Sequence, residues 1–431
     1  MDDNIVLVKL WGQRVGYLHW DRTHSAGIFE YEPAFVAGHL DIAPLTMPIN
    51  SERSRRGLPW IGEKGKIYQG LPPMMADSLP DKWGNSVFNA WIHRQRIPMS
   101  KITPVDRLLY IGTRGMGALE YEPAHVIGKA NFPVDVNELY LFAQSILSER
   151  QETSIKQDKN ILWQDLVKIG TSAGGRRPKA LVAINAATGE IRSGQTDVGD
   201  GFEHYILKFD EANGYPSAKI EYVYSKMAKD AGIFMMPSEI LEHNGIAHFV
   251  TRRFDREHNR KIHTQTFAAL EPSINSYEDA FRLLRRLNLP YGDTEQLYRQ
   301  MVFNVLGRNV DDHTKNFSLC MSPDGRWQLS PAYDLTFSVD LSAPEYVNCQ
   351  SLSIGGKTSQ INKPELEEVG RQQDISNVGE IIEQISEALH SFPRHAQEIE
   401  LPNKYAECIQ CALTPEKGKH IDATHLKTRK L

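Results

Sequence analysis

The sequence predicts an α+β fold with a β-rich N-terminal region and a mostly helical C-terminal region. Residues 4–20 alternate apolar and polar side chains about a Gly12-Gln13-Arg14 turn, which is the pattern of a β-hairpin. Residues 378–389 instead carry apolar side chains at helical spacing. Between these regions, residues 297–329 show a helical pattern followed by a hairpin pattern. The chain therefore contains both element types, with strands concentrated early and helices late.

Composition and charge narrow the class of protein. The chain has 431 residues, of which 41% are hydrophobic and 24% charged, as is ordinary for a globular protein of two or three domains. Its formal net charge is −5 and its isoelectric point is about 6.3, whereas dedicated nucleic-acid binders are usually basic. We therefore expect any DNA contact to come through a partner.

Cysteine usage and apolar runs bear on the compartment. The four cysteines are too few and too late in the chain for a disulfide framework. The acidic N-terminus lacks the long apolar core of a signal peptide. No apolar run reaches the length of roughly 18 residues that a membrane-spanning helix needs. We expect a cytoplasmic protein with no membrane contact.

The region before residue 150 predicts strands and helices but no catalytic cluster. Residues 79–84, Leu-Pro-Asp-Lys-Trp-Gly, lead into a helix with Asp81 as its N-cap. Residues 112–118 are glycine-rich, yet they lead into a strand at 118–121 and not into a helix, which argues against a dinucleotide-binding loop. An amphipathic helix is predicted at residues 137–151.

A second glycine-rich stretch, residues 169–179, favours phosphate binding. Gly170 and Gly175 have the spacing of a Walker A motif, but two arginines stand where lysine and serine or threonine belong. A strand at 180–184 follows in place of a helix. These features favour a kinase-type loop, whose glycines let the backbone approach phosphates, over a P-loop NTPase. A solvated surface turn is the alternative.

A lysine and a glutamate follow at a spacing that kinases use. Lys208 lies between apolar residues in a strand predicted at 204–210, and Glu221, thirteen residues later, is predicted to open a helix. Kinases pair a strand lysine with a helix glutamate, and a buried lysine needs such a partner. The alternative is a lysine that solvates the edge of a sheet.

The most informative stretch contains Asp311, Asn316 and Asp334. The first two lie five residues apart after a predicted helix, and the third follows a predicted hairpin that returns the chain close to its start. Protein kinases place a catalytic Asp, a metal-binding Asn and a second metal-binding Asp in this order. An acidic surface turn is one alternative. A metal-hydrolase site with Asp311, Asp312 and His313 is another, but further ligands at suitable spacing are missing.

Four motifs together carry a family resemblance. They are Asp311-x-His313-x-Lys315-Asn316-Phe317, Pro331-x-Tyr333-Asp334-Leu335, the Leu-Pro-Asp-x-Trp-Gly pattern at 79–84, and Arg253-Phe254-Asp255-Arg256. Over residues 1 to 400, roughly, the chain resembles the HipA family of bacterial serine/threonine kinase toxins. The resemblance implies a two-lobed protein-kinase-like fold. Residues 1–130 would form a HipA-like N-terminal subdomain, 131–255 the kinase N-lobe, and 256–431 a helical C-lobe with the catalytic and metal-binding loops.

The resemblance also implies roles for individual residues. Asp311 would be the catalytic base, with His313 and Lys315 beside it, and Asn316 and Asp334 would hold Mg²⁺. ATP would be bound by Thr171, Ser172, Ala173, Gly174, Gly175, Lys179, Lys208, Glu221, Arg252, Arg253 and Phe254. The family often has Glu at the position of Arg252, so a side-chain contact with adenine there is in doubt, whereas backbone contacts are not.

The implied function is that of an ATP- and Mg²⁺-dependent toxin kinase. Family members phosphorylate an aminoacyl-tRNA synthetase, commonly the glutamyl enzyme. A helix-turn-helix antitoxin, HipB, neutralises them and carries the complex to operator DNA. Autophosphorylation is expected in the glycine-rich loop, at Thr171 or Ser172. A kinase of a lipid or another small molecule, and a catalytically quiet co-repressor subunit, are the alternatives.

The C-terminal residues Cys408, Cys411, His420 and His425 are of the types that bind zinc. The gap between the cysteines and the histidines is shorter than in a zinc finger, and the segment is terminal and lysine-rich. We therefore favour packed cysteines and a frayed tail over a zinc site.

Overall fold

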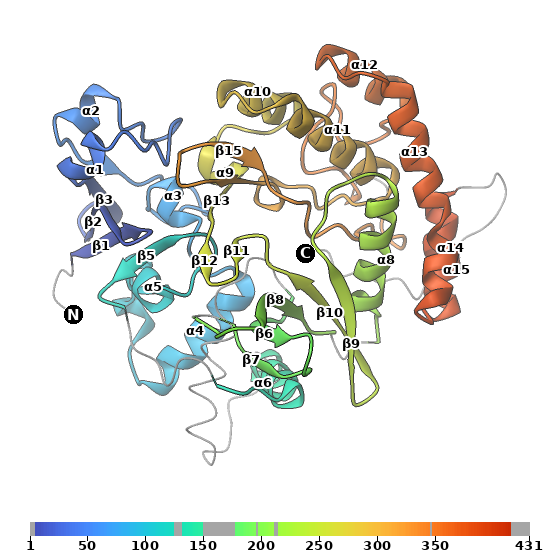
Figure 1. Ribbon diagram of the computed structural model, residues 1–431, viewed down its shortest axis with the longest axis horizontal. Helices are drawn as coiled ribbons and strands as arrows, with labels where there is room; N and C mark the ends of the chain where they lie inside the picture. The colour runs from blue at the N-terminus through green and yellow to red at the C-terminus, as the bar shows by residue number, and fades with distance from the viewer. Residues whose placement is uncertain are drawn as a thin grey trace. The chain divides into compact units, whose positions relative to one another are not determined.

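The computed structural model describes residues 5–124, 132–149, 177–194, 197–210, 214–344 and 347–414 (Figure 1). The chain forms two compact units. The first contains residues 1–209, 250–272 and 320–326, and the second contains residues 210–249, 273–319 and 327–431. The boundaries near residues 130 and 255 that the sequence suggests for three domains stay predictions.

The first unit begins with a five-stranded antiparallel sheet, in the order β4-β3-β2-β1-β5 (Figure 1). Its strands are β1 (Val6–Leu10), β2 (Gln13–Asp21), β3 (Ala26–Tyr31), β4 (Trp60–Ile61) and β5 (Leu119–Glu122). The predicted hairpin is confirmed, but its turn lies one residue earlier, at Trp11-Gly12, with φ of 48° and 79°. Two positive φ values in a two-residue turn match the right-handed twist of paired strands, so Gln13 already pairs with Leu10.

Helices follow the sheet in the first unit. They are α1 (Pro33–Ala37), α2 (Glu52–Arg55), α3 (Pro73–Ala76), α4 (Lys82–Arg94), η1 (Met99–Lys101), α5 (Pro104–Ile111), α6 (Val136–Glu149) and α9 (Phe267–Leu270). The predicted N-cap of α4 is confirmed, because the Asp81 carboxylate accepts a 2.7 Å hydrogen bond from the Gly84 N–H. The predicted amphipathic helix is α6, which buries Leu139, Phe142 and Ile146.

A second sheet in the first unit contains β7 (Ile191–Ser193), β6 (Lys179–Asn185) and β8 (Phe202–Lys208), in that order. The end of β10 (Ile246–Arg252) also belongs to this unit. Strands β11 (Arg256–Glu257) and β12 (Arg260–Lys261) form a small hairpin, and β13 (His263–Thr266) follows. The strands predicted at 180–184 and 204–210 are therefore confirmed, and β6 is almost completely buried.

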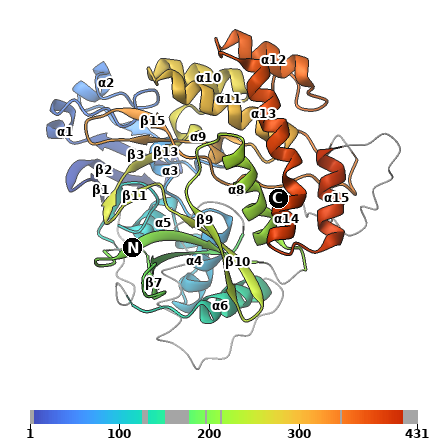
Figure 2. The ribbon, with the colours of Figure 1, turned by 45° about the vertical axis from the view of Figure 1, so that its right-hand side comes forward.

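The second unit is mostly helical. Its helices are α8 (Ser217–Asp230), α10 (Tyr277–Arg286), α11 (Tyr291–Leu306), η2 (Thr314–Asn316), α12 (Lys363–Gln372), α13 (Val378–His390), α14 (Phe392–Glu398) and α15 (Asn403–Leu413). Figure 2 shows α14 between α8 and α15. The predicted stripe of α13 is confirmed, since Ile381, Ile382 and Ile385 are buried. This unit also holds β9 (Ser238–His243), β15 (Trp327–Leu329) and the start of β14 (Ser318–Met321).

One helix boundary differs from the prediction. Glu221 does not open a helix, because α8 begins four residues earlier at Ser217, which places Glu221 in its second turn. Pro216 precedes the helix and cannot continue a helix toward the N-terminus, so it sets the start. Glu221 is 4% exposed. In the part of the chain that the structure describes, the helices are too short or too polar to cross a bilayer.

Candidate active site

The loop that holds Asp311 is fixed at its backbone. Helix α11 ends at Leu306. At the next residue, Gly307, a β-carbon would lie 2.5 Å from the Phe303 carbonyl oxygen, so any larger residue would require the backbone to shift. The Ser338 hydroxyl accepts hydrogen bonds from the N–H groups of Val310 at 2.7 Å and Asp311 at 3.2 Å. One hydroxyl thus satisfies two donors that lack a helical or strand partner, and it sets the path of the loop.

Asp311 itself is partly open to solvent, with 35% of its side chain exposed. The Asn316 side-chain nitrogen donates to the Asp311 carbonyl at 2.7 Å, so the amide predicted to bind metal is tied to the loop of the predicted base. The His313 Nε2 atom lies 3.8 Å from an Asp311 carboxylate oxygen. Partial burial raises the pKa of Asp311; a charge on His313 lowers it, and the nearby Asp334 carboxylate raises it.

Asp334 stands in an unusual backbone conformation. Its φ is 55°, in the left-handed region that residues other than glycine seldom adopt. The preceding Tyr333 hydroxyl donates to the Lys315 carbonyl at 2.9 Å, and the Ser318 hydroxyl lies 2.6 Å from it. These contacts join Tyr333 to the first residue of β14 and to Lys315 in the loop that follows Asp311. A strained conformation held by surrounding contacts is typical of functional sites.

Asp312, unlike the neighbouring Asp311, is buried, with 1% of its surface exposed. One oxygen accepts from the Tyr277 hydroxyl at 2.8 Å, and the other accepts from the Ser351 N–H at 2.6 Å. The Gln350 amide nitrogen, in the orientation that satisfies its partners, is 3.1 Å from both oxygens. Burial raises the pKa of Asp312 to about 7, against the effect of these hydrogen bonds.

Asp312 is therefore an anchor of the loop, which sequence reasoning missed. The Tyr277 hydroxyl also accepts from the Asn304 side chain at 3.0 Å, and Asn304 accepts from Asn309 at 2.9 Å. The network connects α10, α11 and the loop. Asn304 and Asn309 need hydrogen bonds because they are buried, and since their burial is not visible in the sequence, no local signal pointed to this network.

In the first unit, two lysines of the predicted phosphate site are neighbours. Lys179 and Lys208 face each other in the β6–β8 register, so both side chains lie on the same face of the sheet. They are 3% and 7% exposed, which makes the sheet-edge alternative for Lys208 wrong. The Lys179 ammonium lies 3.9 Å from the Asp81 carboxylate.

The predicted adenine-contacting residues divide by environment. Arg252 pairs with Glu203 at 2.7 Å and is about one third exposed. Arg253 is completely buried, and its guanidinium makes two 2.8 Å hydrogen bonds with the Asp255 carboxylate. Phe254 is half-buried. A contact between Arg253 and adenine would thus have to use the backbone, because the side chain is committed to Asp255.

Asp255 is the centre of a buried charge cluster. It also accepts from Arg256 at 2.7 Å and from the Gly117 N–H at 2.7 Å, and Arg256 donates to the carbonyl groups of Gly115 and Gly117. Burial alone would raise the pKa of Asp255, but the two guanidinium groups hold it well below its usual value. The cluster explains the Arg-Phe-Asp-Arg motif as a structural anchor within the first unit.

The structure brings the predicted catalytic and metal-binding residues together in the second unit. These are Asp311, His313, Lys315, Asn316 and Asp334. Lys179, Lys208, Arg252, Arg253 and Phe254 lie in the first unit, and Glu221 lies in the second. Thr171, Ser172, Ala173, Gly174 and Gly175 lie outside the described residues, so their predicted phosphate contacts and modification stay predictions.

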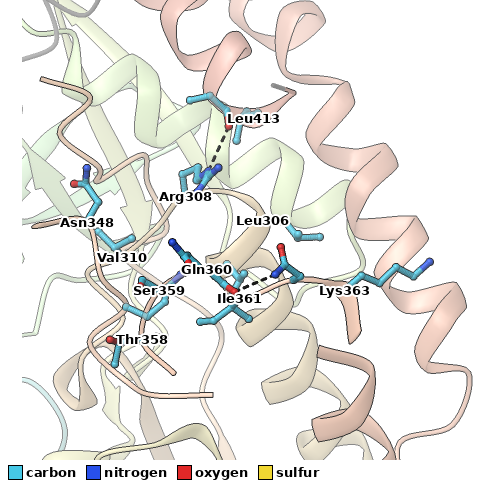
Figure 3. Close-up of a pocket in the computed structure, with 14 residues that line it drawn as sticks. Leu306, Arg308, Val310, Asn348, Thr358, Ser359, Gln360, Ile361, Lys363 and Leu413 are labelled. Atoms are coloured by element: carbon cyan, nitrogen blue, oxygen red, sulfur yellow. Dashed lines mark hydrogen bonds between the residues drawn. The ribbon is translucent and has the colours of Figure 1, made fainter. Parts of the chain in front are cut away.

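A cavity of about 560 Å³ lies in the second unit (Figure 3). It is lined by the end of α11, residues 358–363 and the end of α15, and it reaches Val310 and Gln350. Figure 3 shows Arg308 directed toward the end of α15, where its Nε donates to the Ala412 carbonyl at 3.4 Å. Asp311, Asn316 and Asp334 do not line this cavity, so we do not assign it to catalysis.

Within the described residues, no three His, Cys, Asp or Glu side chains gather in an arrangement that could hold a metal ion. Cys408 and Cys411 are half-buried cysteines on α15. His420 and His425 lie outside the described residues, so the zinc question stays open. Asn316 and Asp334 would need phosphate oxygens or water to complete a magnesium shell.

Two protein families match this chain, one near its N-terminus and one from residue 171 onward. The family described as "HipA N-terminal domain" matches residues 6–122, and the family described as "HipA-like C-terminal domain" matches residues 171–392. Two curated proteins of Sinorhizobium fredii are also similar. "Putative kinase Y4mE" is 28% identical over 183 residues, and "Putative kinase Y4dM" is 29% identical over 148 residues. These alignments cover 39% and 33% of this chain, and 42% and 36% of the relatives.

A solved structure extends the likeness along the chain. The HipA of Shewanella oneidensis, determined in complex with HipB and its operator DNA, matches with a TM-score of 0.65. The match covers 95% of each chain at 16% sequence identity, so it shows a shared fold. The predicted α+β fold, β-rich at the N-terminus and helical at the C-terminus, is confirmed. With a family match that spans more than half of its length, this chain belongs to the HipA family.

Proposed function

We propose that this chain is an ATP- and Mg²⁺-dependent serine/threonine protein kinase and the toxin of a HipA/HipB-like toxin–antitoxin pair. The observation that carries the proposal is the grouping of Asp311, Asn316 and Asp334 in one unit. The Asn316 amide is bonded to the Asp311 carbonyl, and the Asp334 carboxylate is close enough to raise the pKa of Asp311. Family membership and relatives named as putative kinases support it.

The residues present fit a magnesium ion that would be bound together with a nucleotide. Two neighbouring carboxylates repel each other, and a divalent cation relieves that repulsion. The hydrogen bond from Asn316 uses the nitrogen of its amide, which leaves the oxygen as the group of the type that Mg²⁺ prefers. When bound, the ion would neutralise charge on the phosphate oxygens. Asn316 and Asp334 would hold it.

Asp311 would accept the proton of the substrate hydroxyl. A general base works best when its pKa lies near the working pH, and partial burial together with Asp334 moves Asp311 in that direction. Its 35% exposure leaves room for a substrate to approach. His313, at 3.8 Å, would tune the charge of Asp311, and Lys315 would stabilise the charge that develops on the transferred phosphoryl group.

The first unit would supply the nucleotide contacts. Lys208 would bind the α- and β-phosphates, and residues 171–179 would cover them through their backbone N–H groups. Arg252 and Phe254 would border adenine. Autophosphorylation at Thr171 or Ser172 would place about 1.5 to 2 negative charges near the ATP phosphates and so oppose nucleotide binding.

Partners follow from the family and from charge. We propose a small HipB-like helix-turn-helix antitoxin, with operator DNA contacted only through that complex, because the net charge of −5 disfavours binding of DNA by this chain alone. The protein substrate would be an aminoacyl-tRNA synthetase, and the glutamyl enzyme is the first candidate. The chain would act in the cytoplasm. Strong sequence-specific operator binding by the isolated chain would contradict this assignment.

One experiment tests the function directly. The purified chain is incubated with γ-labelled ATP, Mg²⁺ and a cell lysate, and labelled proteins are identified by mass spectrometry. We expect one dominant labelled protein, lost when Mg²⁺ is chelated and in the Asp311→Asn variant. Label found only in lipid or small molecules would favour the alternative kinase. A chain that binds no nucleotide would favour a quiet co-repressor.

A further inference from the structure

Two neighbouring buried lysines carry positive charges that nearby negative groups must compensate. Lys179 and Lys208 face each other on neighbouring strands and expose 3% and 7% of their surface. Like charges directly opposite each other in a sheet are destabilising, and burial increases that cost. Such a pair is stable when carboxylates or a bound anion supply negative charge.

Asp81 supplies part of that charge from a distant part of the sequence. Its Oδ2 atom lies 3.9 Å from the Lys179 ammonium, and its Oδ1 atom accepts the hydrogen bond that caps α4. The cap holds the carboxylate at the start of the helix, so its position is determined by α4. Asp81 is itself 14% exposed, which limits screening by solvent.

Trp83, two residues further on, holds the backbone of the same lysine. Its indole Nε1–H donates to the Lys179 carbonyl at 2.9 Å, and the side chain is 1% exposed. The Leu-Pro-Asp-Lys-Trp-Gly segment thus contacts Lys179 at both ends, through its ammonium group and its carbonyl oxygen. All of these residues lie in the first unit.

We propose that Asp81 and Trp83 are positioning residues that hold Lys179 beside Lys208, so that both ammonium groups face the phosphates of a nucleotide. The inference rests on the proposed kinase function. It extends the nucleotide site to residues 79–84, in a region where the sequence predicts no catalytic cluster. Asp81 contacts the ammonium group of Lys179 and Trp83 contacts its backbone carbonyl, so these two residues hold Lys179 at both its side chain and its backbone. Removing either positioning contact should therefore weaken nucleotide binding.

Two substitutions distinguish an effect on the position of Lys179 from an effect on the stability of the fold. Asp81→Asn keeps an equally good helix cap and removes the charge, and Trp83→Phe keeps an aromatic ring and removes the donor to Lys179. We expect each to raise the Kd for ATP about three- to tenfold, as for one lost hydrogen bond or ion pair, with kcat at saturating ATP changed less than about threefold. Titration calorimetry of the full chain measures the Kd, and thermal unfolding confirms the fold.

Matched controls are available in the same unit. Thr103→Asn exchanges the cap residue of α5, and Trp91→Phe makes the aromatic exchange elsewhere on α4. Both should leave the Kd for ATP unchanged. A Kd in Asp81→Asn and Trp83→Phe equal to the wild-type value would overturn the proposal, as would a lower Kd in Asp81→Asn, since that result would make Asp81 a charge that merely opposes phosphates.

The outcome also separates this inference from the proposed function. If the wild-type chain binds ATP and the two variants bind it equally well, the kinase function stands and the positioning role is refuted. If the wild-type chain itself binds no ATP, the proposed function fails, and the positioning role is refuted with it.

Discussion

The buried cluster around Asp255 and the open cluster around Asp311 each centre on an aspartate, but the aspartate has different neighbours in the two clusters. Asp255 is fully enclosed, and two arginines and a backbone N–H satisfy it, so its charge is retained and its pKa lies far below normal. Asp311 is 35% exposed beside a second carboxylate, and its pKa is raised. Asp255 is thus matched by positive charge inside the fold, whereas Asp311 lies beside a carboxylate of the same charge.

The degree of pairing of a carboxylate therefore distinguishes structural from functional acidic residues in this fold. Removing a completely paired, buried carboxylate destabilises the fold because its partners remain as buried charges, and such a carboxylate has no capacity left for a ligand. A carboxylate that is half-exposed and repelled by a neighbour can be stabilised further by a cation or a proton, which is what a phosphoryl-transfer site requires. Asp312 lies between these cases, buried like Asp255 but adjacent to Asp311.

The largest expected effect comes from breaking the buried cluster. Asp255→Ala leaves the guanidinium groups of Arg253 and Arg256 buried without a counter-charge, and we expect a loss of about 3–5 kcal/mol in the free energy of unfolding. Urea denaturation followed by circular dichroism measures it. As a control, Arg252→Ala removes a partly exposed pair with Glu203 and should cost no more than about 1 kcal/mol. Equal losses in the two variants would refute the contrast.

Removing the predicted base should act on activity without acting on the fold. Asp311→Asn should lower the phosphorylation rate by about 10²- to 10⁴-fold. Stability should stay the same or rise slightly, because repulsion with Asp334 is relieved. Initial rates at saturating ATP, with denaturation of the same sample, check both parts. Substantial unfolding of this variant would mean that Asp311 is structural.

The same substitution one residue later should have the reverse outcome. Asp312→Asn places an amide among donors from Tyr277 and Ser351, and we expect a loss of about 1–3 kcal/mol in stability. Its effect on the rate should be smaller than that of Asp311→Asn and should follow from the displaced loop. A larger loss of rate at Asp312 than at Asp311 would move the catalytic base by one residue.

Asp312 also predicts a pH dependence. Its pKa of about 7 lies above the unfolded value of about 3.9, so between these two values the folded state binds more protons than the unfolded state. Stability from this group is therefore present at low pH and falls as the pH rises from about 4 to about 7. The advantage of the wild type over Asp312→Asn should be larger at about pH 5 than at about pH 8. An advantage that grows with pH would contradict the burial argument.

The smallest expected effect concerns His313. A charge on this residue lowers the pKa of Asp311 across 3.8 Å, so His313→Gln should raise that pKa and move the acid limb of the rate profile to higher pH. Both side chains are partly exposed, and salt should therefore reduce the shift. Rate–pH profiles at low and high salt measure it. A profile that does not move in either condition would remove His313 from the site.

Local features of the sequence determined the elements and the order of the catalytic parts. The hairpin of β1 and β2, the cap of α4 and the buried stripe of α13 follow from alternation, from a capping residue and from helical spacing, each of which acts over a few residues. Asp311 and Asn316 lie five residues apart on one loop, so local geometry brings them together. The family motifs rest on the same short spacings.

Only the tertiary structure decided which charged residues are buried and with what partners. The family motif assigns the base to Asp311, but the burial of Asp312 depends on Tyr277, 35 residues away, and on Ser351, 39 residues away. The contact of Asp255 with Gly117 spans 138 residues, and that of Trp83 with Lys179 spans 96. Burial and ion pairing are set by the packing of distant elements, and periodicity and capping, which report only on neighbouring residues, carry no information about either.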